Sequence, residues 1–205
     1  MKHTDYTGIV PAQYTGREIE AASSAVLKTE NEAITFYDIV KERLLHVNNW
    51  HRVAGILSAK FQLVNATGAP VDRNVQQGDH FRIDIPGPGS PEGDGYDWVW
   101  VEEVKEVSEA NIQSIGIRVR PAPNPLGGKH ETAHFYSHEA TSNFIVTREN
   151  STVIARIIDR NIKPNDHASS LIDKIRDSAV GISAIGMFSK VQWQGLANGL
   201  VKNDD

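Results

Sequence analysis

Histidines gather in one short stretch of this chain, and imidazole suits both acid–base and metal chemistry near neutral pH. His130, Glu131 and His134 spell the pattern H-E-x-x-H. On a helix this spacing stacks two imidazoles around one zinc ion, with the glutamate as general base. Gly127-Gly128 before the pattern and Phe135-Tyr136 after it favour a strand instead. Residues four apart on a strand are separated by roughly 13 Å, so we predict no metal site here.

A strand over 131–138 would place His134, Tyr136 and His138 on the same face. If that face turns inward, the three side chains supply polar groups that bind the head group of a ligand in a cavity, or a metal through neutral imidazoles. If it turns outward, they are ordinary surface residues, and Phe135 on the opposite face favours this alternative. His134, Tyr136 and His138 are therefore candidate ligand-binding residues whose orientation the sequence leaves open.

Two tryptophans form a second candidate group. Trp98 and Trp100 share one face of an expected strand with Glu102, while valines occupy the other face. Aromatic side chains of this size line binding cavities, but they also simply fill space where the indole N–H finds an acceptor. Both interpretations stay open, and both tryptophans are kept as candidate ligand-binding residues.

Other site chemistries find little support. The chain has no cysteine, which excludes disulfides, thiolate nucleophiles and cysteine-bound zinc. Gly127-Gly128-Lys129 lacks the remaining residues of a phosphate-binding loop, and there is neither a G-x-S-x-G elbow nor a dinucleotide fingerprint. Glu92, Asp94 and Asp97 lack the order of a calcium loop. We therefore predict no cofactor and name no catalytic residue.

Composition limits the partners. The 205 residues carry a net charge of −5, which argues against nucleic acid or an anionic membrane as the main partner. The N-terminal residues lack the apolar stretch of a secretory signal. The longest uncharged run, 178–189, is too short to span a bilayer. We expect a soluble, cytoplasmic protein that binds a small apolar ligand, and its oligomeric state stays open.

The expected elements must position these residues. Apolar and small side chains recur at steps of three and four along the C-terminal segment and predict a helix over 170–201. The stripe contains Ile172, Ile175, Ala179, Ile182, Gly186, Ser189, Trp193, Leu196 and Leu200. The small residue Gly186 near its middle either leaves room for a ligand or lets the helix approach a sheet closely, so it is a further candidate for ligand binding.

A second helix is expected near the N-terminus, from Thr29 to about Val47. Thr29 and Glu32 form a capping-box pattern. Asn48-Asn49 follows as a plausible stop. The stripe of this helix contains Ala33, Phe36, Tyr37, Val40, Leu44 and Val47.

Between the two helices the chain alternates between apolar and polar residues, which is typical of antiparallel strands buried on one face. The alternation is clear at 61–63, 81–85 and 115–119, and strands are also expected at 97–107, 131–138, 142–148 and 152–160. Residues 17–27 fit a strand or a helix, and 86–95 is a Gly/Pro loop. We expect an irregular segment over 1–16 and a single α+β domain over 17–205.

This order of elements resembles the START/Bet v 1-like (helix-grip) superfamily. The resemblance rests on the Phe36–Val47 helix running into Trp50-His51, on the strands, and on the Ile172–Leu200 helix. It implies a curved antiparallel sheet wrapped around the long C-terminal helix, with a shorter N-terminal helix. It also implies a cavity between sheet and helix that holds a small, mostly apolar or amphipathic ligand.

The resemblance leaves two alternatives to a binding protein. Some helix-grip proteins are cyclases, dehydratases or hydrolases, and in such an enzyme His134, Tyr136 and His138 would be the acid–base groups. Glu102 would then orient one of the imidazoles. The other alternative is a structural or interaction subunit.

Overall fold

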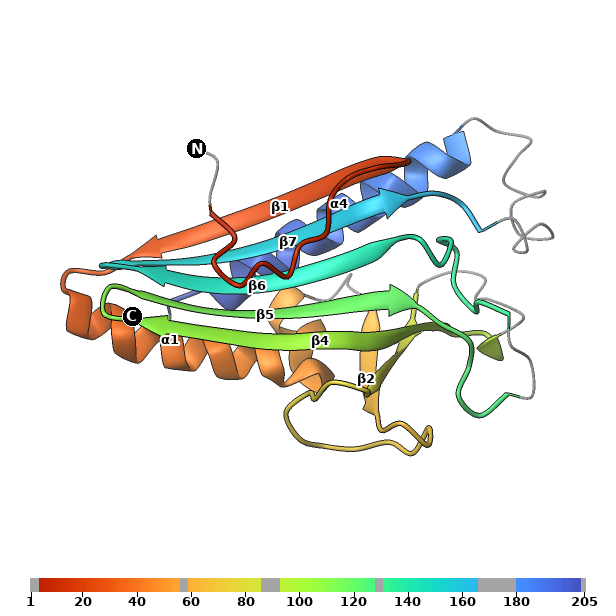
Figure 1. Ribbon diagram of the computed structural model, residues 1–205, viewed down its shortest axis with the longest axis horizontal. Coiled ribbons are helices and arrows are strands. Elements are labelled where there is room, and N and C mark those ends of the chain that lie inside the picture. Colours follow the sequence, from red (N-terminus) through yellow and green to blue (C-terminus); the bar gives the residue numbers. More distant parts are fainter. Residues whose placement is uncertain (1–3, 56–58, 86–92, 128–130, 166–179, 204–205) are drawn as a thin grey trace.

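The computed structural model describes residues 4–55, 59–85, 93–127, 131–165 and 180–203, and for 180–188 the backbone alone. The described chain forms a curved antiparallel sheet in the order β1-β7-β6-β5-β4-β3-β2 (Figure 1). The strands are β1 (Arg17–Val26), β2 (Lys60–Val64), β3 (His80–Asp84), β4 (Asp97–Glu109), β5 (Ile112–Pro121), β6 (Thr141–Glu149) and β7 (Thr152–Ile162).

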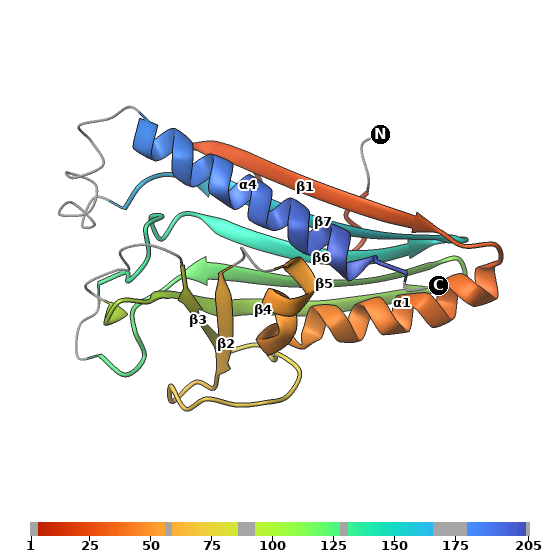
Figure 2. The ribbon, with the colours of Figure 1, turned by 180° about the vertical axis from the view of Figure 1, so that it is seen from behind.

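The helices lie over one face of this sheet (Figure 2). They are α1 (Glu30–Leu45), η1 (Val47–Asn49), α2 (Trp50–Ala54) and α4 (Val180–Leu200). In Figure 2, α4 crosses β1 and β7 diagonally, while α1 runs along the lower side of the sheet. The α+β class, the antiparallel sheet and the long C-terminal helix are those expected from the sequence. The part of the expected C-terminal helix before Val180 lies outside the described residues.

Helix α1 begins where its capping residues predict. The Thr29 hydroxyl accepts a hydrogen bond from the Glu32 amide at 3.2 Å, which satisfies one of the free N–H groups of the first turn. The helix ends at Leu45, two residues earlier than expected, and Val47 belongs to the short η1 turn. All six residues of the predicted stripe are buried, so the stripe faces the core as expected.

The sheet confirms most of the expected strands and resolves one ambiguity. Residues 17–26 form β1, which pairs with β7 along nearly its whole length. Without β1, one edge of β7 would expose a long row of unpaired backbone N–H and C=O groups. The alternation in β7 does not show which segment pairs with this edge. The short strand β2 forms the opposite edge.

The predicted strand over 131–138 is wrong. This segment is irregular, and its only bridge joins Tyr136 to Pro164. The Ala133 carbonyl oxygen accepts from the Trp98 amide of β4 at 2.8 Å, but no ladder continues from this bond. Instead, the Asn165 side chain donates to the carbonyl oxygens of Thr132 and His134, both at 3.0 Å. The amide of Tyr136 donates to Nδ1 of His134 at 2.9 Å. Side-chain groups that bind nearby backbone in this way compete with a sheet ladder.

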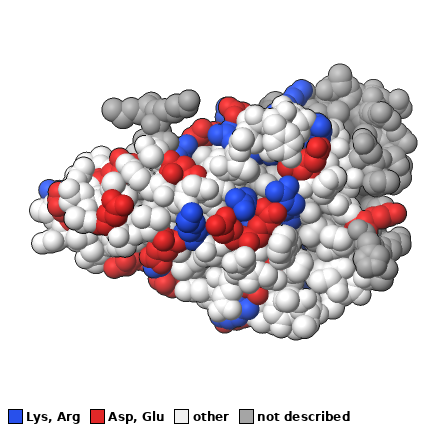
Figure 3. All heavy atoms as spheres, in the orientation of Figure 1, with Lys and Arg blue, Asp and Glu red and all other residues white. Residues whose placement is uncertain are grey.

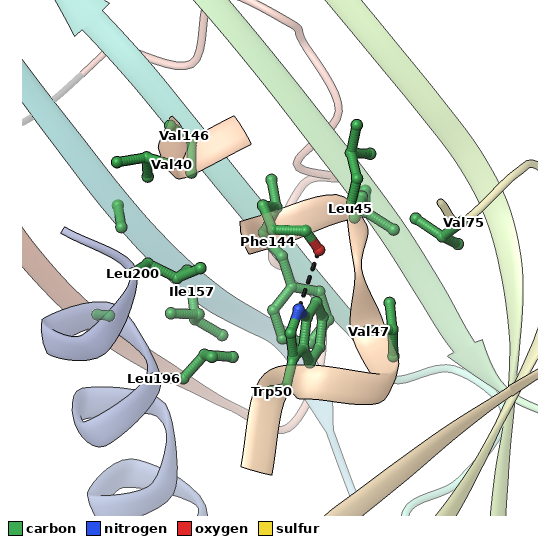
Figure 4. Packing of buried hydrophobic residues seen from close by; sticks show 14 of the residues in the cluster. Val40, Leu45, Val47, Trp50, Val75, Phe144, Val146, Ile157, Leu196 and Leu200 are labelled. Atoms are coloured by element: carbon green, nitrogen blue, oxygen red, sulfur yellow. Dashed lines mark hydrogen bonds between the residues drawn. The ribbon is translucent and has the colours of Figure 1, made fainter. Parts of the chain in front are cut away.

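Trp50 lies at the centre of the core, between the sheet, η1 and α4 (Figure 4). Its ring centre lies 4.6 Å from that of Phe144, 5.3 Å from Phe61 and 5.7 Å from Phe81. Its indole N–H donates to the carbonyl oxygen of Leu44 at 2.9 Å, so its one polar group is satisfied in the interior. This aromatic cluster holds α1, α2 and the sheet together beside the candidate site.

Helix α4 meets α2 through two glycines that the stripe does not include. A Cβ atom on Gly199 would overlap the carbonyl oxygen of Val53, and one on Gly195 would lie 2.8 Å from that of Ala54. Only residues without a Cβ permit this contact. The C-terminal half of α4 is thereby seated against α2 as well as against the sheet.

The N-terminal segment packs on the opposite face of the sheet. In Figure 1 it crosses β6 and β7 on the side away from α4. Ile9 is fully buried there against Ile145 and Ile158. A Cβ on Gly116 would lie 2.9 Å from Cγ2 of Ile9, so this glycine makes room for the segment on β5.

Candidate functional site

A cavity of about 40 Å³ lies between the inner face of the sheet and α4. One water molecule needs roughly 10–15 Å³ of accessible volume, so the cavity has room for about three water molecules. Aromatic and aliphatic side chains from five strands form most of the wall, and α4 contributes Ser189, Gln192 and Trp193. The strand residues in the wall are Phe61, Phe81, Ile83, Val99, Val119, Ser142 and Phe144.

His134 and Tyr136 face this cavity, together with Phe135. The hydroxyl of Tyr136 lies 3.1 Å from Oγ of Ser189, which links the irregular segment to α4. The ring of His134 stacks on that of Phe135 with 4.3 Å between the ring centres. Because the backbone is not a regular strand, all three consecutive side chains reach the same cavity. The polar groups of His134 and Tyr136 therefore lie at one side of a wall that is mostly apolar.

Both polar rings are uncharged near neutral pH. Burial lowers the pKa of His134 to about 3. Its Nδ1 accepts a hydrogen bond from the Tyr136 amide, so the proton of the neutral ring resides on Nε2. Burial also raises the pKa of Tyr136 well above its ordinary value. The site therefore offers neutral hydrogen-bonding groups and no fixed charge from these two residues.

A buried carboxyl group, that of Asp159, contacts Trp193 of the cavity wall. Asp159 is 1% exposed and accepts a hydrogen bond from the indole nitrogen of Trp193 at 2.8 Å. Burial raises the pKa of Asp159 to about 6, although Ser142 and Trp193 oppose the shift. This contact ties β7 to α4 through the same tryptophan that lines the cavity.

Asp97 is a second buried acid on the inward side of the sheet. It pairs with Ile83 in the β3–β4 register and follows the same alternation as the core residues Val99 and Val101. Burial raises its pKa to about 7. A carboxyl group with this pKa changes charge near neutral pH, and such groups concentrate at functional sites.

The remaining predicted residues lie elsewhere. His138 is exposed, and its carbonyl oxygen accepts from Nη1 of Arg120. Trp98 and Trp100 share one face as expected, but this is the outer face of the sheet. Trp98 packs there on Val64 and Ala133, and Trp100 is 40% exposed. Gly186 belongs to the part of α4 for which the backbone alone is described.

Glu102 also lies on the outer face. It forms ion pairs with Arg118 at 2.8 Å and Arg120 at 2.5 Å, and Arg118 also pairs with Glu103. Figure 3 shows acidic and basic groups interleaved across the middle of this face. Since Glu102 is engaged there, it does not orient the imidazole of His134.

Within the described residues, no group of three or more histidine, aspartate or glutamate side chains is placed to hold a metal ion. The first histidine of the H-E-x-x-H pattern, His130, lies outside those residues. The described helices also include none that is both long enough and apolar enough to cross a membrane.

Asp159 is the site residue that sequence reasoning missed, although a signal for it exists. Val153, Ala155 and Ile157 alternate along β7 as buried residues of the inner face, and Asp159 is next in the same period. An acidic residue at the next position of such an alternation is expected to point to the same buried face as the apolar residues before it. The alternation could therefore have identified it.

No protein-family model matches the chain, and no curated protein matches it. Among solved structures it is similar to norcoclaurine synthase from Thalictrum flavum in complex with dopamine and hydroxybenzaldehyde, at 6% identity and a TM-score of 0.37. That match covers 86% of this chain and 84% of the other.

Two further solved structures are similar. Ara h 8.0201 matches at 10% identity and a TM-score of 0.32, over 89% of this chain and 99% of the other. Protein Ms6760 from Mycobacterium smegmatis matches at 14% identity and a TM-score of 0.32, over 85% and 88%. At these scores the similarities say nothing about ligand or activity. The helix-grip arrangement rests on the sheet and helices themselves.

Proposed function

We propose that this protein binds a small apolar or amphipathic molecule between the sheet and α4. The observation that supports it is the division of the cavity wall, which is mostly apolar along the strands and polar at His134, Tyr136 and Ser189. A ligand with one polar end would place that end against Tyr136 and Ser189. Its apolar part would then lie against Phe81, Phe144 and their neighbours, where burial of apolar area stabilises it.

The size of the cavity sets a condition on binding. Because about 40 Å³ holds only a few waters, a larger molecule enters only if α4 moves away from the sheet. Polar contacts from Trp193 to Asp159 and from Ser189 to Tyr136 hold this part of α4. The neighbouring Gln192 also accepts from the Ala59 amide at 3.4 Å, and Gln194 donates to the carbonyl oxygen of Ala22 at 2.9 Å. Binding should therefore change the environment of Trp193, which provides a signal inside the site.

The first experiment asks whether the protein carries a ligand. Native mass spectrometry of protein purified from its host, followed by solvent extraction, would reveal an added mass and its identity. We expect an apolar or amphipathic compound. Protein that remains free of ligand and also fails to bind the probes below would contradict the proposal.

The second experiment uses naphthalene and 1-naphthol, which differ only in one hydroxyl, and follows Trp fluorescence during titration. We expect both to bind and 1-naphthol to bind more tightly, by about tenfold or less, because one neutral hydrogen bond contributes about 1 kcal/mol. Tyr136→Phe should abolish this preference. Tyr14→Phe, at a side chain that is 66% exposed, is the matched control and should preserve it.

A blocking variant tests the location. Val119→Phe adds a ring to the cavity wall and should abolish binding of both naphthalene compounds. Val191→Phe makes the same change at an α4 position that is 71% exposed and should leave binding intact. Thermal unfolding of both variants checks that they fold. Equal binding by Val119→Phe and wild type would place the ligand elsewhere.

Acid–base catalysis by His134, Tyr136 and His138 has less support than binding. His138 is exposed and apart from the other two residues. The low pKa of His134 and the raised pKa of Tyr136 make both poor proton carriers near neutral pH. Glu102, the proposed orienting group, is bound to two arginines on the other face.

A further inference from the structure

A second and much larger hollow lies at the edge of the sheet, beside β2. Its volume is about 630 Å³, within the range typical of small-molecule sites. One wall is formed by η1 and α2, and the other by β2, β3 and residues 70–72. We call it the edge groove. Its lining shares only Phe61 with that of the internal cavity.

Asn48 holds the walls of the edge groove together. Its side-chain oxygen accepts from the Leu63 amide at 2.6 Å, which satisfies an edge N–H of β2. Its side-chain nitrogen donates to the carbonyl oxygen of Val71 at 2.9 Å and to Asp72 at 3.2 Å. One side chain from η1 thereby fixes β2 and the 70–72 segment, so the groove is largely formed before any ligand arrives.

Three cations line the edge groove: Arg52, Lys60 and Arg82. Within the described part of the chain, the side chains of these three residues form neither an ion pair nor a hydrogen bond. The lining also contains two carboxylates. Asp72 is already bound to His46 at 3.0 Å and to Asn48, whereas Asp84 stands opposite Lys60 in the β2–β3 register. Three cations against two carboxylates leave a net positive charge in a chain whose overall charge is −5.

Arg82 is oriented in a way that suits an anion. Its guanidinium carbon lies 4.7 Å from the centre of the Tyr96 ring. An aromatic face holds the guanidinium plane by cation–π attraction while the N–H groups, which lie in that plane, stay available. A guanidinium held in this manner matches the two oxygens of a carboxylate or a phosphate with two parallel hydrogen bonds.

We propose that the edge groove binds a small molecule that bears an oxyanion, either a carboxylate or a phosphate. Arg82 receives the oxyanion through two N–H groups. Lys60 from the edge strand and Arg52 from the facing wall supply the flanking positive charge. This site is independent of the internal cavity, and neither proposal depends on the other.

The test is an NMR titration of ¹⁵N-labelled full-length protein with pyrophosphate and, separately, with citrate. Ionic strength is held constant with sodium chloride. We expect saturable shifts of backbone amides in η1, α2, β2 and β3. The anion that binds more tightly tells whether the site prefers phosphate or carboxylate. Shifts that do not saturate with either anion, or that are spread over the whole surface, would overturn the proposal.

Variants assign the shifts to the groove. Arg82→Gln should weaken binding at least about tenfold, since it removes two charge-assisted hydrogen bonds. Lys60→Gln should weaken it about threefold or more, and it tests the site even if Arg82→Gln does not fold. The matched control is Lys105→Gln, an exposed lysine on β4 outside the lining, which should bind as wild type does. Affinities of Arg82→Gln and Lys60→Gln within twofold of wild type would overturn the proposal.

The blocking variant of the internal cavity separates the two sites. Val119→Phe should leave pyrophosphate and citrate binding unchanged, because Val119 does not line the edge groove. Loss of anion binding in Val119→Phe would contradict a site at the edge of the sheet.

Discussion

The indole nitrogen of Trp193 lies 2.8 Å from Oδ2 of Asp159, and both side chains are buried between α4 and β7. This contact joins the long C-terminal helix to the sheet at the wall of the internal cavity. The acceptor is the carboxyl group of Asp159, whose pKa is raised to about 6. The charge of this group therefore depends on pH, and so does the free-energy cost of burying it.

Compared with the wild type, the Asp159→Asn variant should become relatively more stable as the pH rises. Since the pKa of Asp159 increases from 3.8 to about 6 on folding, the folded state binds the proton more tightly. The wild type therefore loses stability between pH 4 and 6 from this group, by about 3 kcal/mol. The amide oxygen of asparagine still accepts from Trp193 and never ionises. Urea unfolding at pH 4, 5, 6 and 7 should show the variant gaining on wild type up to pH 6 and levelling off above it.

Asp84→Asn is the matched control, because Asp84 is exposed on β3. It should change the free energy of unfolding by less than about 0.5 kcal/mol. A difference between Asp159→Asn and wild type that is the same at all four pH values would contradict the burial of an ionisable Asp159.

His134 should remain neutral in the folded protein down to about pH 4. Burial lowers its pKa from 6.5 to about 3, so between these values the unfolded state binds more protons and stability falls with acid. NMR of the imidazole nitrogens measures this directly, with the urea-unfolded protein as reference. Folded-state titration near pH 6.5 would show that the ring is accessible to water.

His134→Asn separates this effect from that of Asp159, whose contribution has the opposite sign over pH 4–6. The asparagine oxygen can take the place of Nδ1 as acceptor of the Tyr136 amide. Compared with wild type, the variant should therefore become relatively more stable as the pH falls from 6.5 to 3. An equal acid sensitivity of variant and wild type would show that another group causes it.

Gly199→Ala should destabilise the protein by about 1–3 kcal/mol, because the added Cβ overlaps the carbonyl oxygen of Val53. Helix propensity alone predicts the opposite, a gain of about 1 kcal/mol. Asn198→Ala, at the exposed neighbouring position, is the control and should be neutral or slightly stabilising. Urea unfolding decides the sign, and a more stable Gly199→Ala would exclude close packing of α4 on α2.

Gly116→Ala should loosen the N-terminal segment from the outer face. The new Cβ would lie 2.9 Å from Ile9 and 3.1 Å from the Thr7 hydroxyl. We expect faster hydrogen exchange at the Val10 amide, which donates to Asp5 at 2.9 Å, with a global loss of about 1 kcal/mol. Ile9→Ala removes the same contact from the other side and should give the same local effect. Unchanged exchange in both would show that this packing does not hold the segment.

The periodic patterns of the sequence determined the elements that bury one face. The stripe from Ala33 to Val47 predicted α1 and its turn to within two residues, since each turn of an amphipathic helix must present its apolar side to the core. Alternation at 81–85 and 115–119 predicted β3 and β5 and their inward residues for the corresponding reason. From these patterns and their order, the α+β architecture followed.

The tertiary structure alone decided what the site contains. His134 and Tyr136 turn inward and His138 does not, because hydrogen bonds from Asn165 and within the segment replace the expected strand. Asn165 lies about thirty residues along the chain from Thr132 and His134, and its position follows no period. The same holds for the Trp193–Asp159 contact, which joins residues 34 apart, and for the edge groove, whose walls meet through Asn48. Local patterns record which face a residue takes, whereas contacts between distant segments arise only when the elements pack.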